Sequence, residues 1–194
     1  MTHNLLKKHI REKVDISNHL LDTVCSYFEL RTVEKGDFVL RQYQICQFEG
    51  FVLEGCFKVF TIDKEGKENI LYFAAEDWWL MDLDSFSNRR PSDLNIQALE
   101  TSKILYIKKT DKEYLYEHYP IVEKLFRIIS QKAIVAWQRR LIRNHCQTAT
   151  ERYLYFVTTY PNIVSRLTDR QIAAYLGITH EFLSKIKKRQ KEKL

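Results

Sequence analysis

The chain has 194 residues, of which 45% are hydrophobic and 13% aromatic, and its formal net charge is +6. This length and apolar content suffice for one large or two small packed domains and argue against intrinsic disorder. We recognise no secretory signal and no membrane-spanning apolar run, so we expect a cytoplasmic protein without a membrane partner.

The polar residues give no pattern typical of an enzyme. The six histidines are scattered without a pair at i and i+4, and neither a Gly-rich phosphate loop nor a G-x-S-x-G elbow occurs. The four cysteines form no C-x-x-C pair, which fits a reducing compartment and buried thiols. We therefore expect no catalytic residues, no metal and no cofactor.

The first half of the chain predicts a helix followed by short strands. His19–Leu30 carries apolar residues at helical spacing. Turn sequences such as Lys35-Gly36-Asp37 then separate short β-rich runs, which predict an antiparallel sandwich or barrel. The runs are Phe48–Leu53, Phe57–Ile62, Asn69–Phe73, Asn95–Leu99 and Lys103–Ile107.

A long helix is predicted after Pro120, which suits a first helical turn. Apolar residues spaced three and four positions apart predict a coiled-coil-like seam along this helix. One face could pack on the strands and the other on a second copy of the chain; the alternative is a helix wrapped entirely by its own domain. The predicted seam consists of Val122, Leu125, Ile129, Ala133 and Ala136.

The C-terminal segment Leu167–Lys188 has the pattern of a helix-turn-helix. Thr168 is a predicted N-cap, Gly177 fits the turn, and Thr179 is predicted to cap a second helix with a basic outer face. A helix of this kind fits the major groove of B-DNA. An amphipathic hairpin with a merely solvated basic face is the alternative.

Positive charge gathers in this segment. Between Thr168 and the C-terminus there are seven basic and three acidic residues, a surplus of four charges. Double-stranded DNA is the expected partner, although the last residues could simply form a solvated end. The predicted DNA contacts are Thr168, Arg170, Thr179, His180, Glu181, Ser184, Lys185 and Lys188.

From these motifs the chain resembles the CRP/FNR family of bacterial transcription regulators. The resemblance implies an α+β fold with three parts. Residues 1–113 would form an antiparallel β-roll, or double-stranded β-helix, like that of cyclic-nucleotide-binding domains. Residues 114–145 would form a long dimerisation helix, and residues 146–194 an all-α helix-turn-helix domain. It also implies that Thr179, His180, Glu181 and Lys185 read bases.

The stretch that would hold a cyclic nucleotide departs from the family pattern. Met81 and Asp82 stand where a Gly-Glu pair is expected, Ser92-Asp93-Leu94 occupies the phosphate element, and no Arg falls in register. We therefore expect an effector other than cAMP, or none. The candidate pocket for an unknown small molecule comprises Trp78, Trp79, Met81, Asp82, Arg89, Arg90, Ser92 and Asp93. The alternative is that the aromatic side chains only fill the roll.

Two functions follow from this. The first is a homodimeric, sequence-specific DNA-binding transcription regulator. The second is a cyclic-nucleotide or small-molecule sensor whose basic tail binds a protein partner rather than DNA, which a lack of DNA sequence preference would favour.

Overall fold

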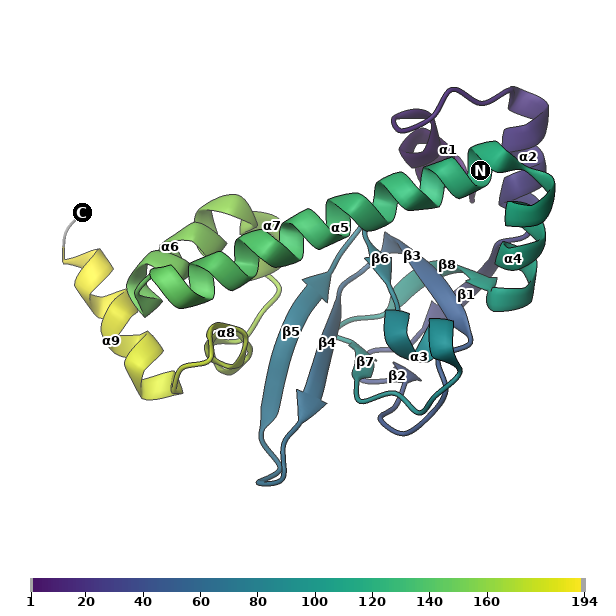
Figure 1. Cartoon of the computed structure of the whole chain (residues 1–194). Coiled ribbons are helices and arrows are strands. Elements are labelled where there is room, and N and C mark those ends of the chain that lie inside the picture. Colours follow the sequence, from purple (N-terminus) through teal and green to yellow (C-terminus); the bar gives the residue numbers. More distant parts are fainter. Residues whose placement is uncertain (1, 193–194) are drawn as a thin grey trace.

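Two four-stranded antiparallel sheets lie at the centre of the computed structural model, which describes residues 2–192 (Figure 1). The strand orders are β1-β8-β3-β6 and β2-β7-β4-β5. The strands are β1 (Glu29–Val33), β2 (Phe38–Leu40), β3 (Phe48–Glu54), β4 (Phe57–Ile62), β5 (Glu68–Ala74), β6 (Trp79–Leu80), β7 (Asn95–Ala98) and β8 (Ser102–Lys108). These bounds confirm the antiparallel roll predicted from short strands separated by turns.

Both faces of the sheets are covered over much of their area, although the edge strand β1 is exposed from Glu29 to Thr32. The inner faces share a core that includes Val52, Phe57 and Ile96. Helices cover both outer faces, so in β4 the four consecutive residues 57–60 are all buried. A strand buried on both sides has no need to alternate apolar and polar residues, which explains its nearly continuous apolar run.

Helices extend from both ends of the roll. The long helix α5 runs the length of the molecule, from α2 and α4 at one end to α6 and α9 at the other (Figure 1). The helices are α1 (Asn4–Arg11), α2 (Asn18–Ser26), α3 (Leu83–Asn88), α4 (Lys109–His118), α5 (Pro120–Cys146), α6 (Ala149–Thr159), α7 (Pro161–Val164), α8 (Asp169–Leu176) and α9 (His180–Lys191). The domain boundary expected between residues 113 and 114 falls inside α4.

The N-terminal region differs from the prediction. The helix expected over His19–Leu30 ends at Ser26, because the chain then enters β1 and Leu30 lies opposite Leu105 of β8. Local periodicity cannot detect a partner strand 75 residues away. Helix α1 was not predicted, although Leu6 and Ile10 have helical spacing and are fully buried.

The cysteines only partly follow the expectation of buried thiols. Cys25, Cys46 and Cys56 are free and buried, whereas Cys146 at the end of α5 is exposed. Burial raises the pKa of Cys25 to about 11 and that of Cys56 to about 12, so these thiols stay protonated and pack as apolar groups. Within residues 2–192, no helix combines the length and the apolar content needed to cross a membrane.

Candidate nucleic-acid interface and effector cassette

Helices α8 and α9 form a compact pair around a tight turn. Thr168 and Gln171 make a reciprocal capping box at the start of α8, as predicted. Gly177 has φ +68° at the end of α8, a left-handed conformation that glycine adopts without a steric penalty. Thr179 Oγ1 then accepts from the Phe182 N–H at 3.1 Å and caps α9, which confirms the predicted cap.

The inner face of this pair is apolar and anchors it to the molecule. Ile172, Ala173 and Leu176 of α8 are buried, and so are Leu183 and Ile186 of α9. Most of this set belongs to one cluster with residues of β4, β5 and α6. The burial of Leu183 and Ile186 determines the orientation of α9, because it turns the opposite side of the helix outward.

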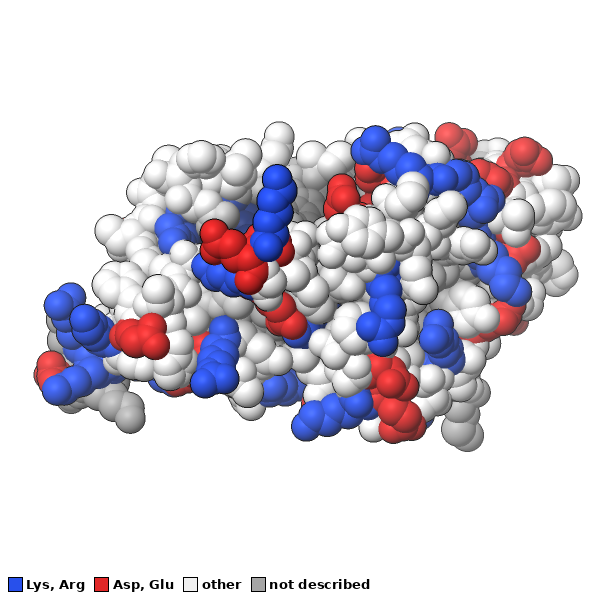
Figure 2. Space-filling view, turned by 90° about the horizontal axis from the view of Figure 1, so that it is seen from below, with Lys and Arg blue, Asp and Glu red and all other residues white. Residues whose placement is uncertain are grey.

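The outer face of α9 carries polar side chains that are open to solvent. The exposed residues here are His180, Glu181, Ser184, Lys185, Lys188 and Arg189. Ser184 donates to the His180 carbonyl at 3.1 Å. Within residues 2–192, Lys185 and Lys188 form no ion pair or side-chain hydrogen bond. Figure 2 shows Lys and Arg side chains at the end of the molecule that α9 occupies in Figure 1.

Lys187 and Glu181 make contacts within the helix pair. Lys187 pairs with Asp169 at 2.7 Å and so ties α9 to the first turn of α8. Hydrogen bonds from its own backbone N–H and from Thr179 lower the pKa of Glu181, which therefore stays ionised near the N-terminus of α9. Thr168 and Arg170 lie exposed where α8 begins.

A second set of contacts holds the C-terminal helices against the roll. Arg166, between α7 and α8, donates to Glu76 at 3.0 Å, Glu100 at 3.1 Å and the Gly55 carbonyl at 3.3 Å. The two carboxylates raise the pKa of Arg166, which stays charged. This arginine therefore joins the loop before α8 to three separate turns of the sheets.

Arg140 of α5 forms a further anchor. It donates to the carbonyls of Ile70 at 3.3 Å and Tyr175 at 3.1 Å, and its guanidinium lies 4.1 Å from the centre of the Tyr175 ring. Burial lowers its pKa. Arg140 thus links α5, β5 and α8, so it is taken up in structure rather than available to DNA.

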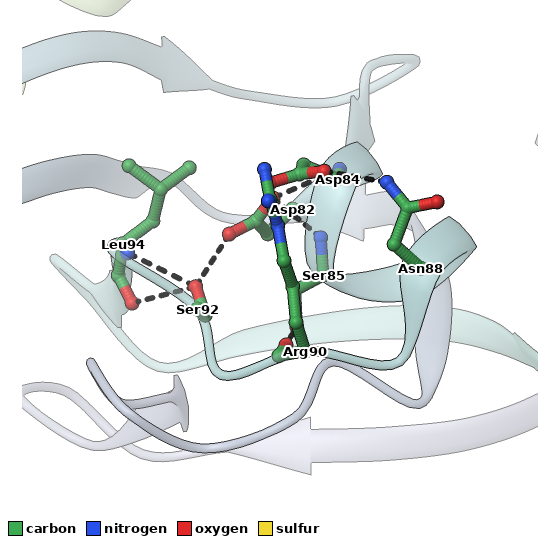
Figure 3. A network of polar contacts seen from close by, with 7 residues as sticks. All are labelled: Asp82, Asp84, Ser85, Asn88, Arg90, Ser92 and Leu94. Carbon is green, nitrogen blue, oxygen red and sulfur yellow. Dashed lines mark hydrogen bonds and ion pairs between the residues drawn. The ribbon is translucent and has the colours of Figure 1, made fainter.

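The stretch that would hold a cyclic nucleotide, the cassette at residues 82–94 between β6 and β7, is closed by hydrogen bonds among its own residues (Figure 3). Buried Asp82 caps α3 by accepting from the backbone N–H groups of Asp84 at 3.0 Å and Ser85 at 3.1 Å. Its other oxygen accepts from the Ser92 hydroxyl at 2.6 Å. A carboxylate of the chain thus occupies the donors that an anion would need.

The remaining charged residues of the cassette point to solvent or pair locally. Arg90 forms an ion pair with Asp84, and Asp93 is exposed. Arg89 is exposed and ends α3 with φ +56°. The structure therefore brings Asp82 and Ser92 together but places neither arginine against them.

The two tryptophans of the expected pocket face different cores. Trp79 packs near Phe51 and Phe126, and its indole N–H donates to His9 Nε2 at 2.9 Å. Trp78 packs against Tyr160, with 5.6 Å between ring centres. Trp78 lies just before β6 and packs on the two cores around Val52 and Phe73, whereas Trp79 packs on the core of the N-terminal helices, so the two rings do not line one pocket.

Three surface cavities stand out on the described residues, with volumes of about 380, 260 and 290 Å³. The first lies along α1 and the second beside the end of α9. Of the expected pocket residues, Arg89 alone lines one of these cavities, on a basic surface beside Tyr106 and Lys108. The described residues also contain no group of three or more His, Cys, Asp or Glu that could hold a metal.

The predicted seam of α5 divides between two environments. Val122, Leu125 and Ile129 are buried against the chain's own N-terminal helices and roll, whereas Ala133 and Ala136 are exposed. The buried three are therefore not available to a second copy. An apolar strip is open on the second half of the helix instead, with exposures of 43–60%; it consists of Ile134, Val135, Leu141 and Ile142.

The fold and the domain have known counterparts. Residues 30–119 match the family model of the cyclic nucleotide-binding domain. These residues belong to that domain family. No protein of curated function matches the chain in sequence.

Solved structures share the fold of the cyclic nucleotide-binding domain and of the helices after it. CLP of Xanthomonas campestris, described as a c-di-GMP-responsive global regulator, has a TM-score of 0.75 at 11% identity over 91% of this chain and 93% of its own. FixK2 of Bradyrhizobium japonicum has a TM-score of 0.72 at 15% identity over 86% and 85%. A CRP/FNR-family transcriptional regulator from Eubacterium rectale has a TM-score of 0.72 at 15% identity over 92% and 85%. The structural neighbours are thus CRP/FNR-family regulators.

Two features of the C-terminal helices were not revealed by the sequence, the ion pairs of Arg166 and the exposure of Phe182. Arg166 precedes α8 as one basic residue among many, and only the fold brings Glu76 and Glu100 to it. Phe182 was overlooked because an apolar residue in an amphipathic helix is usually counted as core. Its position, about 100° from Leu183 but only about 40° from Ile186 in helical angle, places it at the border of the inner face, so local spacing gave no clear signal of its exposure.

Proposed function

We propose that the chain is a homodimeric, sequence-specific DNA-binding transcription regulator of the CRP/FNR type, which acts in the cytoplasm and has no enzymatic activity. Its helix pair α8–α9 would be the helix-turn-helix, with α9 in the major groove. The observation that carries the proposal is the outer face of α9, where Lys185 and Lys188 are exposed while Leu183 and Ile186 hold the inner face.

Each expected DNA contact has a role that fits its position. His180, Glu181 and Lys185 lie exposed in the first two turns of α9, where side chains reach base edges. Ser184 and Lys188 lie beside them and suit phosphate contacts. Thr168, Arg170 and Thr179 lie at helix N-termini, which also suit phosphates; the exposed Arg189 joins them.

A homodimer is supported by the open strip of α5. Ile134 and Leu141 are seven residues apart, and so are Val135 and Ile142, which is the repeat of a coiled-coil seam. With Trp137, five large apolar side chains are exposed on this helix, which is typical of an interaction surface. Two copies would present two α9 helices to half-sites about 34 Å apart.

The test of DNA binding is selection of genomic fragments by the purified protein, followed by titration on the recovered sequence. We expect Lys185→Ala to weaken specific binding by at least about tenfold. Lys35→Ala removes the same charge from an exposed turn of the roll and should leave affinity unchanged. Recovery of fragments with no common sequence would contradict the proposal and favour a basic tail that binds a protein partner.

The test of the homodimer is the molar mass in solution. Val135→Ser combined with Ile142→Ser should convert a dimer to a monomer in sedimentation velocity. Leu83→Ser alters an apolar residue of α3 that is equally exposed and should keep the dimer. A wild-type protein that is monomeric both free and on DNA would overturn this part.

The effector is proposed to be a small molecule other than cAMP, or to be absent. Asp82 already satisfies the N–H groups of Asp84 and Ser85, and a phosphate placed beside that carboxylate would be repelled. We expect no rise in melting temperature with cAMP, cGMP or c-di-GMP. A saturable rise with any of them would contradict a closed cassette.

A further inference from the structure

The first turn of α9 presents one aromatic ring to solvent. Phe182 is 44% exposed, whereas the next residue, Leu183, is fully buried. The backbone N–H of Phe182 donates to the Thr179 cap, so the cap fixes the backbone from which the ring projects in the first turn of α9. Within residues 2–192, the Phe182 ring takes part in no aromatic pair and no cation–π contact.

Helical geometry places this ring at the edge of the outer face of α9, on the side of Lys185. At about 100° per residue, Phe182 lies about 60° from Lys185 and about 20° from Arg189 around the α9 axis, and about 40° from buried Ile186. Lys185 and Arg189 are both exposed. A helix that enters the groove with Lys185 toward the bases therefore brings the Phe182 ring against the same groove wall.

The major groove offers one apolar group that suits such a ring. Thymine carries a 5-methyl group there, whereas the other standard bases present hydrogen-bond donors and acceptors. An exposed phenyl ring gains free energy by covering a methyl group and gains none beside an unpaired donor. The backbone that carries the ring is held by a capped helix turn, so contact costs side-chain freedom but little backbone freedom.

We propose that Phe182 is a specificity-determining residue that recognises thymine through its 5-methyl group in each half-site. This inference rests on the proposed function, since it requires α9 to enter the major groove. It adds a base preference that neither His180, Glu181 nor Lys185 supplies, because their polar groups cannot sense a methyl group. The preferred sites then hold a thymine at the position that faces Phe182.

The test removes the methyl group without altering base pairing. In the duplex selected by the wild-type protein, each thymine is replaced in turn by deoxyuridine. We expect one position per half-site at which wild-type affinity falls by about 3–10-fold, as burial of one methyl group predicts. Phe182→Ala should bind the thymine and uracil duplexes equally, and Phe182→Leu should keep part of the difference.

Lys185→Ala is the matched control on the same helix. It should weaken binding to both duplexes while keeping the difference between them. Equal uracil penalties in wild type and Phe182→Ala, or no penalty at any position, would overturn the inference and leave DNA binding intact. If the wild-type protein selects no sequence at all, the proposed function fails and this inference fails with it. Melting curves of the variants establish that each remains folded.

Discussion

The cassette at residues 82–94 and the outer face of α9 are both polar, but they use their polar groups in opposite ways. In the cassette, Asp82 accepts from two backbone N–H groups and from Ser92, so its hydrogen bonds are made within the chain. On α9, Lys185 and Lys188 are exposed side chains. A polar group that is satisfied internally stabilises the fold, whereas one held open by the fold is available to a partner.

The largest expected effect tests whether the inner and outer faces of α9 contribute differently to stability. Leu183→Ala removes a fully buried side chain, and we expect the free energy of unfolding to fall by about 3 kcal/mol because a cavity remains. Lys185→Ala on the outer face should change it by less than about 0.5 kcal/mol. Urea denaturation measures both, and equal losses would mean that the two faces are not distinct.

In the cassette, unlike on the outer face of α9, we expect the substitution of a polar side chain to lower the stability of the protein. Asp82→Ala leaves the Asp84 and Ser85 N–H groups without their acceptor and leaves the Ser92 hydroxyl only the Leu94 carbonyl at 3.2 Å, and we expect a loss of about 2 kcal/mol. Asp93→Ala changes an exposed carboxylate nearby and should cost almost nothing. A stable Asp82→Ala protein would show that the network contributes little, in which case the site is less closed than the structure indicates.

A smaller effect tests how α9 is positioned. Thr179→Ala removes the cap of α9, and we expect a loss of about 1 kcal/mol. Thr179→Ser keeps an oxygen at the same place and should retain most of that stability. Thermal unfolding of the two variants checks this. If Ser and Ala are equally destabilising, the threonine contributes through its methyl group instead of its hydroxyl.

The smallest expected effect is on pH dependence, at His9. Its Nε2 accepts from Trp79, so its Nδ1 carries the proton and donates to Asp77 at 2.6 Å, which describes a neutral ring. Burial lowers the pKa of His9, and Asp77 partly offsets that shift. The unfolded state therefore binds more protons below about pH 6.5, and stability should fall as the pH drops through that value.

Removing the titrating group provides the check. In His9→Gln, the difference in melting temperature between pH 7.5 and pH 5.5 should become smaller than in wild type. His19→Gln alters an exposed histidine of α2 and should leave the difference as it is. A wild-type melting temperature that does not decrease toward pH 5.5 would contradict the neutral, buried His9.

The helix caps and turns could be predicted from the sequence, whereas the packing of the cores could not. Thr168, Gly177 and Thr179 act within four residues of themselves, so local spacing was sufficient to predict α8, its turn and the start of α9. The same holds for the β4–β5 hairpin across Asp63–Lys67. The resemblance based on these motifs agrees with the domain family of residues 30–119 and with the fold of the solved structures.

The tertiary structure decided which side chains remain free. Periodicity marked an apolar seam on α5 but could not tell that Val122 and Leu125 would be buried in the chain's own core while Val135 and Ile142 stayed exposed. Trp78 and Trp79 are adjacent in sequence, but they pack against different cores. Capping and turn preferences depend on near neighbours and can be deduced from sequence, whereas exposure and ion pairing depend on residues brought together from distant parts of the chain.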